Sequence, residues 1–184
     1  MRPDQGILFM KVGVHAQESL EAIVRRKTKE IEEAGFAFWG YGGNTCHPTA
    51  MVQPFAKKFE QRGGVIVCMH EMDSRHHAEQ VRASHYSVDG RMWEPIPPAI
   101  NVLGSRYALK IKRLRREEFE LPLTNTRVAV GRNRGRRGNL YVYGRVDKAC
   151  LEIDPEGSST GEHTIKISLV ADLCEPYAVF LKNQ

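Results

Sequence analysis

The sequence predicts an α+β fold, with one domain over residues 1–184 made of a helix-containing part, 1–99, and a β-rich part, 100–184. A chain of this length can bury one hydrophobic core and is short for two. Helical spacing of apolar residues ends near residue 61. From residue 100 onward, apolar residues come in short runs between glycine, proline and charged residues, as in a largely antiparallel sheet. We expect N-terminal helices packed on that sheet, which is either open or barrel-like.

The helix-containing part is predicted to run through a strand at 7–14, a helix at 16–34, a strand at 36–39, a helix at 49–61 and a strand at 65–69. The first and last of these strands are nearly continuous apolar runs, as in strands buried on both faces. Gly35 suits the position just after a helix. Pro54 breaks the helical backbone bonding, so the second helix either begins near it or bends there.

The β-rich part is predicted to contain strands at 100–103, 107–114, 126–130, 140–146, 163–170 and 178–181. In the second of these, Tyr, Leu and Ile alternate with Ala and Lys, as in a half-buried strand. Residues 131–139 are mainly Gly, Arg and Asn and cannot form a core, so we expect a mobile loop joining two strands.

The composition is that of a soluble globular protein, with 41% hydrophobic and 27% charged residues. No apolar run approaches the length of a membrane span, and the N-terminus lacks the pattern of a secretory signal. The sequence thus predicts no membrane partner. Four cysteines occur without a CxxC pair, and Cys68, Cys150 and Cys174 lie in apolar runs. We expect free thiols and a cytoplasmic location.

The basic residues are concentrated in one part of the chain. The formal net charge is +5, yet residues 106–145 hold 12 Lys and Arg against three Glu, and the rest of the chain holds 15 basic and 19 acidic residues. A localised basic segment favours a phosphate-bearing partner. On charge alone, a solvated face without a partner is an equal alternative.

Residues 38–48, the aromatic–glycine segment, combine three aromatic residues, three glycines, a cysteine and a histidine. Trp and Tyr offer flat faces for stacking, and glycine lets a ligand approach the backbone closely. We predict that a ligand contacts Trp39, Tyr41, Gly42, Gly43 and Asn44. The alternative is a tight turn whose aromatic residues belong to the core.

The second candidate ligand-binding group is the set of four closely spaced arginines, Arg132, Arg134, Arg136 and Arg137. Arginine forms bidentate bonds to phosphate, and the intervening glycines allow the chain to follow a phosphate backbone. The preferred function is therefore binding of nucleic acid or another phosphorylated, nucleotide-like ligand, with Trp39 or Tyr41 as the stacking surface. Basic residues on neighbouring strands also protect sheet edges from aggregation, which is the competing explanation.

The first alternative is a small enzyme, metal-dependent or not, with a Cys/His pocket lined by Cys46, His47, His70, Glu71 and His85. We expect His47 and His70 to share that pocket. The spacing of these residues matches no named metal motif, so no metal ligand is assigned and the cofactor stays unknown.

The second alternative is a small subunit that docks a protein partner through its basic loop and its proline-rich segment, 93–98. Proline excludes helix at its own position and disfavours it at the preceding one, so this segment should be extended, and extended segments often wrap a surface. The same alternative includes a homo-oligomer, in which the partner is a second copy of the chain.

Overall fold

The structure is a computed structural model that describes residues 4–42, 45–76, 78–143, 146–157 and 163–183, with the backbone alone for residues 74–76. The elements are β1 (Gly6–His15), α1 (Leu20–Ala34), β2 (Ala37–Tyr41), a π-helical turn η1 (Pro48–Val52), α2 (Gln53–Phe59), β3 (Val65–His76), β4 (Ala83–Ser87), β5 (Glu94–Pro95), β6 (Tyr107–Pro122), a 3₁₀ turn η2 (Leu123–Asn125), β7 (Thr126–Val128), α3 (Gly138–Val142), β8 (Lys148–Ile153) and β9 (Thr164–Asn183).

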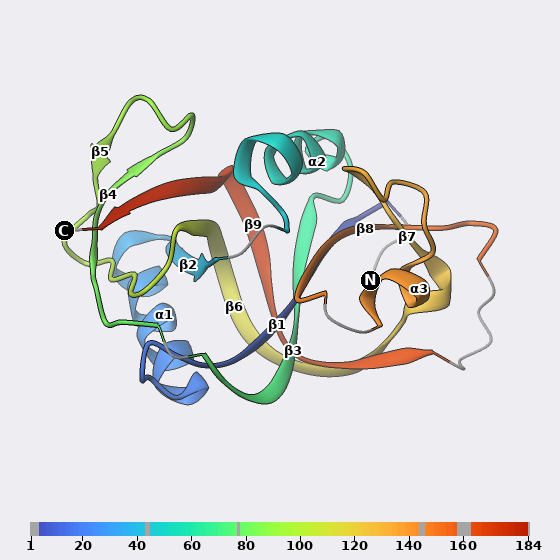
Figure 1. Cartoon of the computed structure of the whole chain (residues 1–184), viewed down its shortest axis with the longest axis horizontal. Helices are drawn as coiled ribbons and strands as arrows, with labels where there is room; N and C mark the ends of the chain where they lie inside the picture. The colour runs from blue at the N-terminus through green and yellow to red at the C-terminus, as the bar shows by residue number, and fades with distance from the viewer. Residues whose placement is uncertain (1–3, 43–44, 77, 144–145, 158–162, 184) are drawn as a thin grey trace.

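One mixed sheet organises the described residues (Figure 1). Its strand order is β2-β6-β9-β3-β1-β8-β7, with β4 added to β9 and β5 to β4. Among the described strands, only β1 and β3 pair in parallel, and the other pairings are antiparallel. The predicted α+β, largely antiparallel class is confirmed. The sheet is not closed, because its path ends at β2 and β7 without a pairing between them in the described part, so the barrel-like form is not observed.

The central strands are buried on both faces, as their apolar runs predict. Residues 7–10 of β1 are at most 3% exposed. Their side chains alternate between two core clusters, one that includes residues of α1 and α2 and another that includes Val142 of α3. The cap of α1 is also as predicted, since Gly35 adopts the left-handed conformation with φ 79° and donates its N–H to the carbonyl of Ile31.

The predicted strand at 140–146 is wrong, because this segment begins with α3. Its alternating Leu-Tyr-Val-Tyr pattern resembles a half-buried strand. In the structure Val142 is buried, whereas Leu140 and Tyr143 are 59% and 60% exposed. Gly138 explains the turn, since a Cβ at this position would lie only 1.9 Å from Oγ1 of Thr126. A backbone packed this closely on β7 begins a helical turn there.

The predicted strands at 163–170 and 178–181 fall in one 20-residue strand, β9, which pairs with β6 from Thr164 to Phe180. Pro176 suggests a break, because proline lacks the N–H that a ladder needs. In the structure Ala178 pairs with Leu109 and Leu173 with Ile111, so the intervening residues of β9 form a bulge. A bulge accommodates proline without interrupting the strand.

The predicted strand at 100–103 is also wrong, although its apolar residues are buried. Ile100 and Val102 belong to a third core cluster with Phe38, Ala83, Ala108 and Val179. The segment makes only an isolated bridge, between Leu103 and Arg82. In the described ranges, no helix is both long enough and apolar enough to cross a bilayer.

Candidate ligand-binding cavity and basic surface

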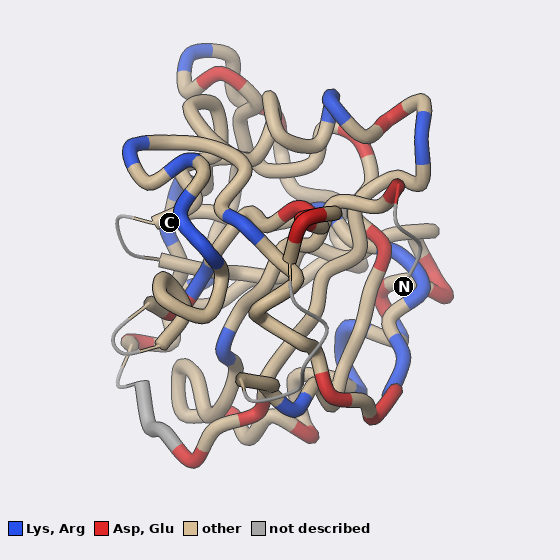
Figure 2. Tube along the Cα trace, turned by 90° about the vertical axis from the view of Figure 1, so that its right-hand side faces the viewer, with Lys and Arg blue, Asp and Glu red and all other residues tan. Residues whose placement is uncertain are grey.

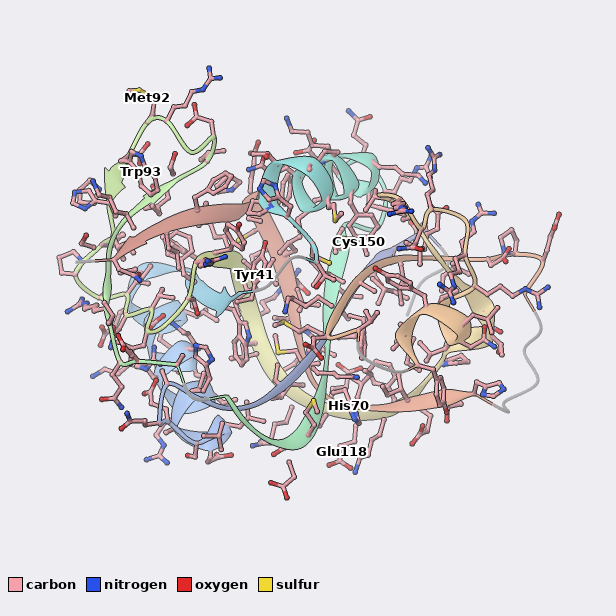
Figure 3. The ribbon with its side chains drawn as sticks, viewed as in Figure 1. Tyr41, His70, Met92, Trp93, Glu118 and Cys150 are labelled. Atoms are coloured by element: carbon pink, nitrogen blue, oxygen red, sulfur yellow. The ribbon has the colours of Figure 1, made fainter. Side chains whose placement is uncertain are left out.

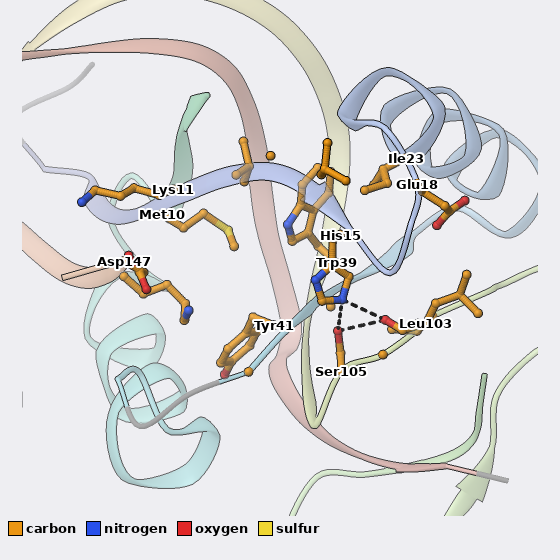
Figure 4. Close-up of a pocket in the computed structure, with 18 of the residues that line it drawn as sticks. Met10, Lys11, His15, Glu18, Ile23, Trp39, Tyr41, Leu103, Ser105 and Asp147 are labelled. Carbon is orange, nitrogen blue, oxygen red and sulfur yellow. Dashed lines mark hydrogen bonds between the residues drawn. The ribbon is translucent and has the colours of Figure 1, made fainter. Parts of the chain in front are cut away.

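A cavity of about 790 Å³ opens between β1, α1, β2, the segment before β6 and the start of β8 (Figure 4). Residues 10–15 of β1 and 102–106 before β6 contribute to its wall. Trp39, Tyr41 and Gly42 also line it. Three of the five predicted ligand contacts in the aromatic–glycine segment therefore border one cavity. The other two, Gly43 and Asn44, lie outside the described residues.

The two aromatic residues are wall residues and not an exposed stacking surface. Trp39 is 5% exposed and Tyr41 is 3% exposed, and both belong to the main core cluster. The hydroxyl of Tyr41 donates a hydrogen bond of 2.8 Å to the carbonyl of Cys46, which holds the ring in place. These two rings can therefore contact only a ligand that enters the cavity.

One end of the cavity is a polar cluster of His15, Ser105 and the carbonyl of Leu103 (Figure 4). Nε2 of His15 lies 3.1 Å from that carbonyl and 3.3 Å from Oγ of Ser105. A carbonyl only accepts, so Nε2 carries the hydrogen and His15 donates. Ser105 also donates to Leu103, at 3.1 Å. His15 is therefore a hydrogen-bond donor here and not a base for Ser105.

Gly40 is the local sequence feature that allows this cluster to form. A Cβ at position 40 would lie 2.4 Å from Oγ of Ser105 and 3.0 Å from Cγ1 of Val102. Only glycine lets the segment before β6 pack this closely on β2. His15 and Ser105 are 90 positions apart, so sequence reasoning missed both, and the glycine at position 40 was the one available signal.

The loop that joins β1 to α1 holds a strained turn at the same end. His15 and Glu18 exchange backbone hydrogen bonds of 3.0 and 2.9 Å across it. The two residues between them, Ala16 and Gln17, have φ of 48° and 64°. Positive φ in residues other than glycine costs about 1–3 kcal/mol each and is concentrated at functional sites. The turn brings both flanking residues into the cavity wall.

The opposite end of the cavity is electropositive. Lys148 is half-buried, and its Nζ lies 5.7 Å from the centre of the Tyr41 ring. Burial lowers the pKa of Lys148, and the neighbouring Cys46 and Asp147 only partly offset this effect. No described carboxylate lies within ion-pair distance of Lys148. Lys11 and Arg106 also line the cavity.

The basic residues that α1 contributes are neutralised inside the protein. Arg26 pairs with Glu18, and the buried Lys27 donates to Glu30 at 2.8 Å and to the carbonyl of Asn101 at 2.6 Å. Burial lowers the pKa of Lys27 to about 8, with Glu30 opposing that shift. These two side chains stabilise the packing of α1, so the unpaired positive charge of the cavity comes from the β8 end.

The predicted Cys/His pocket does not form. His47 caps η1 by accepting from the Ala50 N–H at 3.4 Å and packs against the ring of Phe180, near the end of β9. His70 instead donates from Nδ1 to the carbonyl of Lys166, near the start of β9, at 2.7 Å. Figure 3 shows His70 in the lower half of the molecule, far from α2, the helix that continues from η1 and lies at the top. The expectation that the two histidines share a pocket is wrong.

The other members of that predicted pocket are also dispersed. His85 lies on β4, where its Nδ1 contacts Ser84 at 2.9 Å. Glu71 is exposed on β3. Among the described residues, no group of three or more His, Cys, Asp or Glu side chains could hold a metal ion. These residues thus provide no common site for the metal or nucleophile chemistry considered from the sequence.

All four cysteines are free thiols, as predicted. The Sγ of Cys46 lies 3.9 Å from that of Cys150, and both residues are buried. The hydrogen bond with Cys46, together with burial, raises the pKa of Cys150. A protonated buried thiol is a poor nucleophile. The cellular compartment stays a prediction.

The four arginines form the arginine surface, defined here as Arg132, Arg134, Arg136 and Arg137, all exposed. The predicted mobile loop between two strands is instead a turn that joins β7 to α3. It folds back on β7, because Gly135 donates to the carbonyl of Val128 and Val128 donates to the carbonyl of Arg136, each at 2.8 Å. Figure 2 faces the side of the molecule that carries α3, with lysine and arginine positions in blue.

The cavity and the arginine surface are adjacent but separate. A smaller cavity of about 180 Å³ is lined by Cys46, Arg132 and Asn133, and Thr45 lines both cavities. The function preferred from the sequence assigns the aromatic residues and the arginines to the binding of one ligand. In the structure Trp39 and Tyr41 face the larger cavity only, and the exposed aromatic residue that follows the arginines in the chain is Tyr143, which sequence reasoning did not select.

The proline-rich segment lies on the surface of the fold, and most of its residues are exposed. Pro95 of β5 pairs with His85 of β4, and Ile96 packs against the third core cluster. At the tip of this hairpin, Met92 and Trp93 are 76% and 38% exposed (Figure 3). Docking of a protein partner by this segment stays a prediction.

Comparison of the chain with protein-family models, with curated proteins and with solved structures found no match.

Proposed function

We propose that the protein binds a small phosphorylated, nucleotide-like ligand in the cavity of about 790 Å³. The observation that carries the proposal is Lys148, a half-buried lysine without a described acidic partner in the wall of an aromatic-lined cavity. A cation that is partly removed from water gains most from an anion that enters beside it. Arg106, which follows Ser105 in the chain, also lines the cavity.

The size and lining of the cavity fit such a ligand. Pockets for small molecules typically measure about 300–1,000 Å³ and combine apolar walls with a few polar groups. Here Trp39, Tyr41 and Met72 supply apolar wall, and the cluster of His15 and Ser105 supplies hydrogen-bonding groups. A flat ring bound near Trp39 and His15 would place an attached phosphate toward Lys148. Asp147 and Glu18 also line the cavity and disfavour a ligand with negative charge at both ends.

The test uses Trp39 as the reporter. The chain has two tryptophans, so Trp93→Phe leaves Trp39 alone to report on the cavity. This variant is titrated with nucleoside mono-, di- and triphosphates, ribose 5-phosphate and inorganic phosphate, and its emission is followed. We expect at least one nucleotide to change the emission of Trp39 and to bind more tightly than inorganic phosphate, because the ring contributes contacts.

Lys148→Met in the same background removes the charge and keeps the length of the side chain. Hydrogen bonds to charged groups contribute about 1.5–3 kcal/mol, so we expect about 10- to 150-fold weaker binding. The matched control is Lys57→Met, which removes a charge from the exposed face of α2 and should leave the affinity unchanged. The proposal is wrong if no compound of the panel binds, or if the two lysine variants behave alike.

A further inference from the structure

We infer that the arginine surface, together with the exposed ring of Tyr143, binds single-stranded nucleic acid independently of the cavity. The four arginines lie within six consecutive positions of a turn that is held to β7 by backbone hydrogen bonds. Because the backbone of the turn is already ordered, binding costs little backbone entropy, and the remaining cost is the ordering of the arginine side chains. The turn therefore presents the four guanidinium groups from a preformed backbone.

The charge of this array is not compensated within the protein. None of the four arginines forms an ion pair with a described residue. The acidic residues at the end of the neighbouring strand β8 and just after it have other partners, since Arg127 lies 2.9 Å from Glu152 and 4.0 Å from Asp154. Lys58 pairs with Glu152 as well. The four charges are thus available for a polyanion, and guanidinium groups match phosphate geometry.

An exposed aromatic ring lies directly beyond the array. Arg137 precedes α3 and Tyr143 follows it, and six residues at about 1.5 Å per helical residue separate them by roughly 9 Å. The Tyr143 ring is 60% exposed and meets the ring of His163 edge-on, with centroids 5.5 Å apart. A neighbouring ring on one side holds the phenol in position and leaves area for an incoming base.

The combination favours single strands over duplexes and over acidic proteins. Cationic grooves bordered by exposed aromatic residues hold single strands, because unstacked bases offer a flat face that a duplex keeps inside its stack. An acidic peptide provides charge but no base to stack. The four arginines account for affinity toward any polyanion. Tyr143 is the residue that favours a single strand over a duplex or an acidic peptide.

The experiment measures binding of a fluorescent twelve-residue oligouridylate and oligothymidylate by anisotropy over a range of salt concentrations, with a duplex of equal length and poly-glutamate as competitors. The first variant replaces all four arginines with alanine. Its matched control replaces four other exposed basic residues, Arg25, Lys57, Arg62 and Arg91, and so has the same net charge. Circular dichroism and urea unfolding establish that both variants are folded.

We expect the four-arginine variant to lose most of its affinity and its log–log salt slope to fall by about 0.7 for each phosphate contact removed, whereas the control retains both. Tyr143→Ala should weaken binding of single strands about 5- to 150-fold, and Tyr143→Phe should retain it, because a ring is sufficient for stacking. Lys148→Met in the cavity should leave this binding unchanged, which separates this inference from the proposed function.

Three results would overturn the inference. Equal effects of the two four-residue variants would show that only net charge matters. Binding of the duplex or of poly-glutamate as tight as that of the single strands would exclude single-strand recognition. An unchanged affinity of Tyr143→Ala, with the fold intact, would exclude the stacking role.

Discussion

The close contact at Gly40 gives a sharp test of how the cavity is built. In Gly40→Ala the added Cβ meets Ser105 at 2.4 Å from Oγ and 2.9 Å from Cβ, and it meets Cγ1 of Val102 at 3.0 Å. Rotation of the Ser105 side chain would break its hydrogen bond to Leu103 and would leave the contact with its Cβ in place. The segment before β6 must therefore move away from β2.

The magnitude follows from two opposing effects. Overpacking in a well-packed region costs about 1–3 kcal/mol, and loss of the Ser105–Leu103 hydrogen bond costs about 1 kcal/mol more. Replacing glycine with alanine stabilises by about 0.4–1 kcal/mol through the unfolded chain. We expect the free energy of unfolding of Gly40→Ala to fall by about 1–3 kcal/mol, measured by urea unfolding with tryptophan emission and circular dichroism.

The control lies two residues away, in the same segment. A Cβ at Gly42 would meet no atom within 4 Å, so Gly42→Ala should be neutral or slightly stabilising. Adding Ser105→Gly to Gly40→Ala removes both serine atoms that clash, and it should recover part of the lost stability in a double-mutant cycle. Equal stabilities of the two single glycine variants would refute the close packing of β2 against Ser105.

Three further predictions concern buried polar groups. Without reductant, thiol titration in denaturant should count four free thiols per chain, and fewer would contradict the observed free cysteines. Burial raises the pKa of Cys68 from 9.0 to about 12, so folding favours the protonated thiol. The contribution of this thiol to the free energy of unfolding is complete below pH 9 and is lost toward pH 12, at up to about 1.4 kcal/mol per pH unit. The stability of Cys68→Ala should therefore fall less steeply than that of the parent across this pH range. Lys27→Met should lower the free energy of unfolding by about 3–5 kcal/mol, because it leaves Glu30 buried without its lysine. The double variant Lys27→Met with Glu30→Leu should recover much of that loss, measured by urea unfolding. A single variant as stable as the parent would exclude a structural role for the pair.

The parts of the fold that could be predicted from the sequence are those that local chemistry decides. The apolar runs of β1 and β3 and the glycine after α1 identify buried strands and a helix end without any knowledge of their partners. The errors have a different origin. At α3 and in the bulge of β9, a contact with another strand overrides the local pattern, and the contact of Gly138 with Thr126 cannot be inferred from either residue alone.

The same distinction between local patterns and long-range contacts applies to the residues of the candidate sites. Trp39, Tyr41 and Gly42 could be selected because they are neighbours in the chain, and they do line one cavity. The charged end of that cavity comes from Lys148, which reaches the cavity wall because β1 and β8 pair, with Met10 opposite Lys148. No local pattern at either position signals that pairing. His47 and His70 do not share a pocket, although η1 and β3 are close in the sequence. His47 contacts Phe180 near the end of β9, whereas His70 contacts Lys166 near its start.

Separation of the two candidate sites also changes what each aromatic residue can do. A ring that is 3–5% exposed, as in Trp39 and Tyr41, offers an incoming molecule only the part of its surface that borders the cavity, so it selects ligands by size and shape. A ring that is 60% exposed, as in Tyr143, can accept any base that arrives with its phosphate on the neighbouring arginines. The cavity is thus suited to discriminate among small ligands, and the arginine surface is suited to hold a strand with little regard to its sequence. Thr45 is the one described residue that borders both cavities, so the two linings barely overlap. Titration of the Trp93→Phe protein with nucleotide in the presence and absence of oligouridylate tests the independence of the two sites: the nucleotide affinity should be the same in both, and by linkage any change would have to appear equally when the order of addition is reversed.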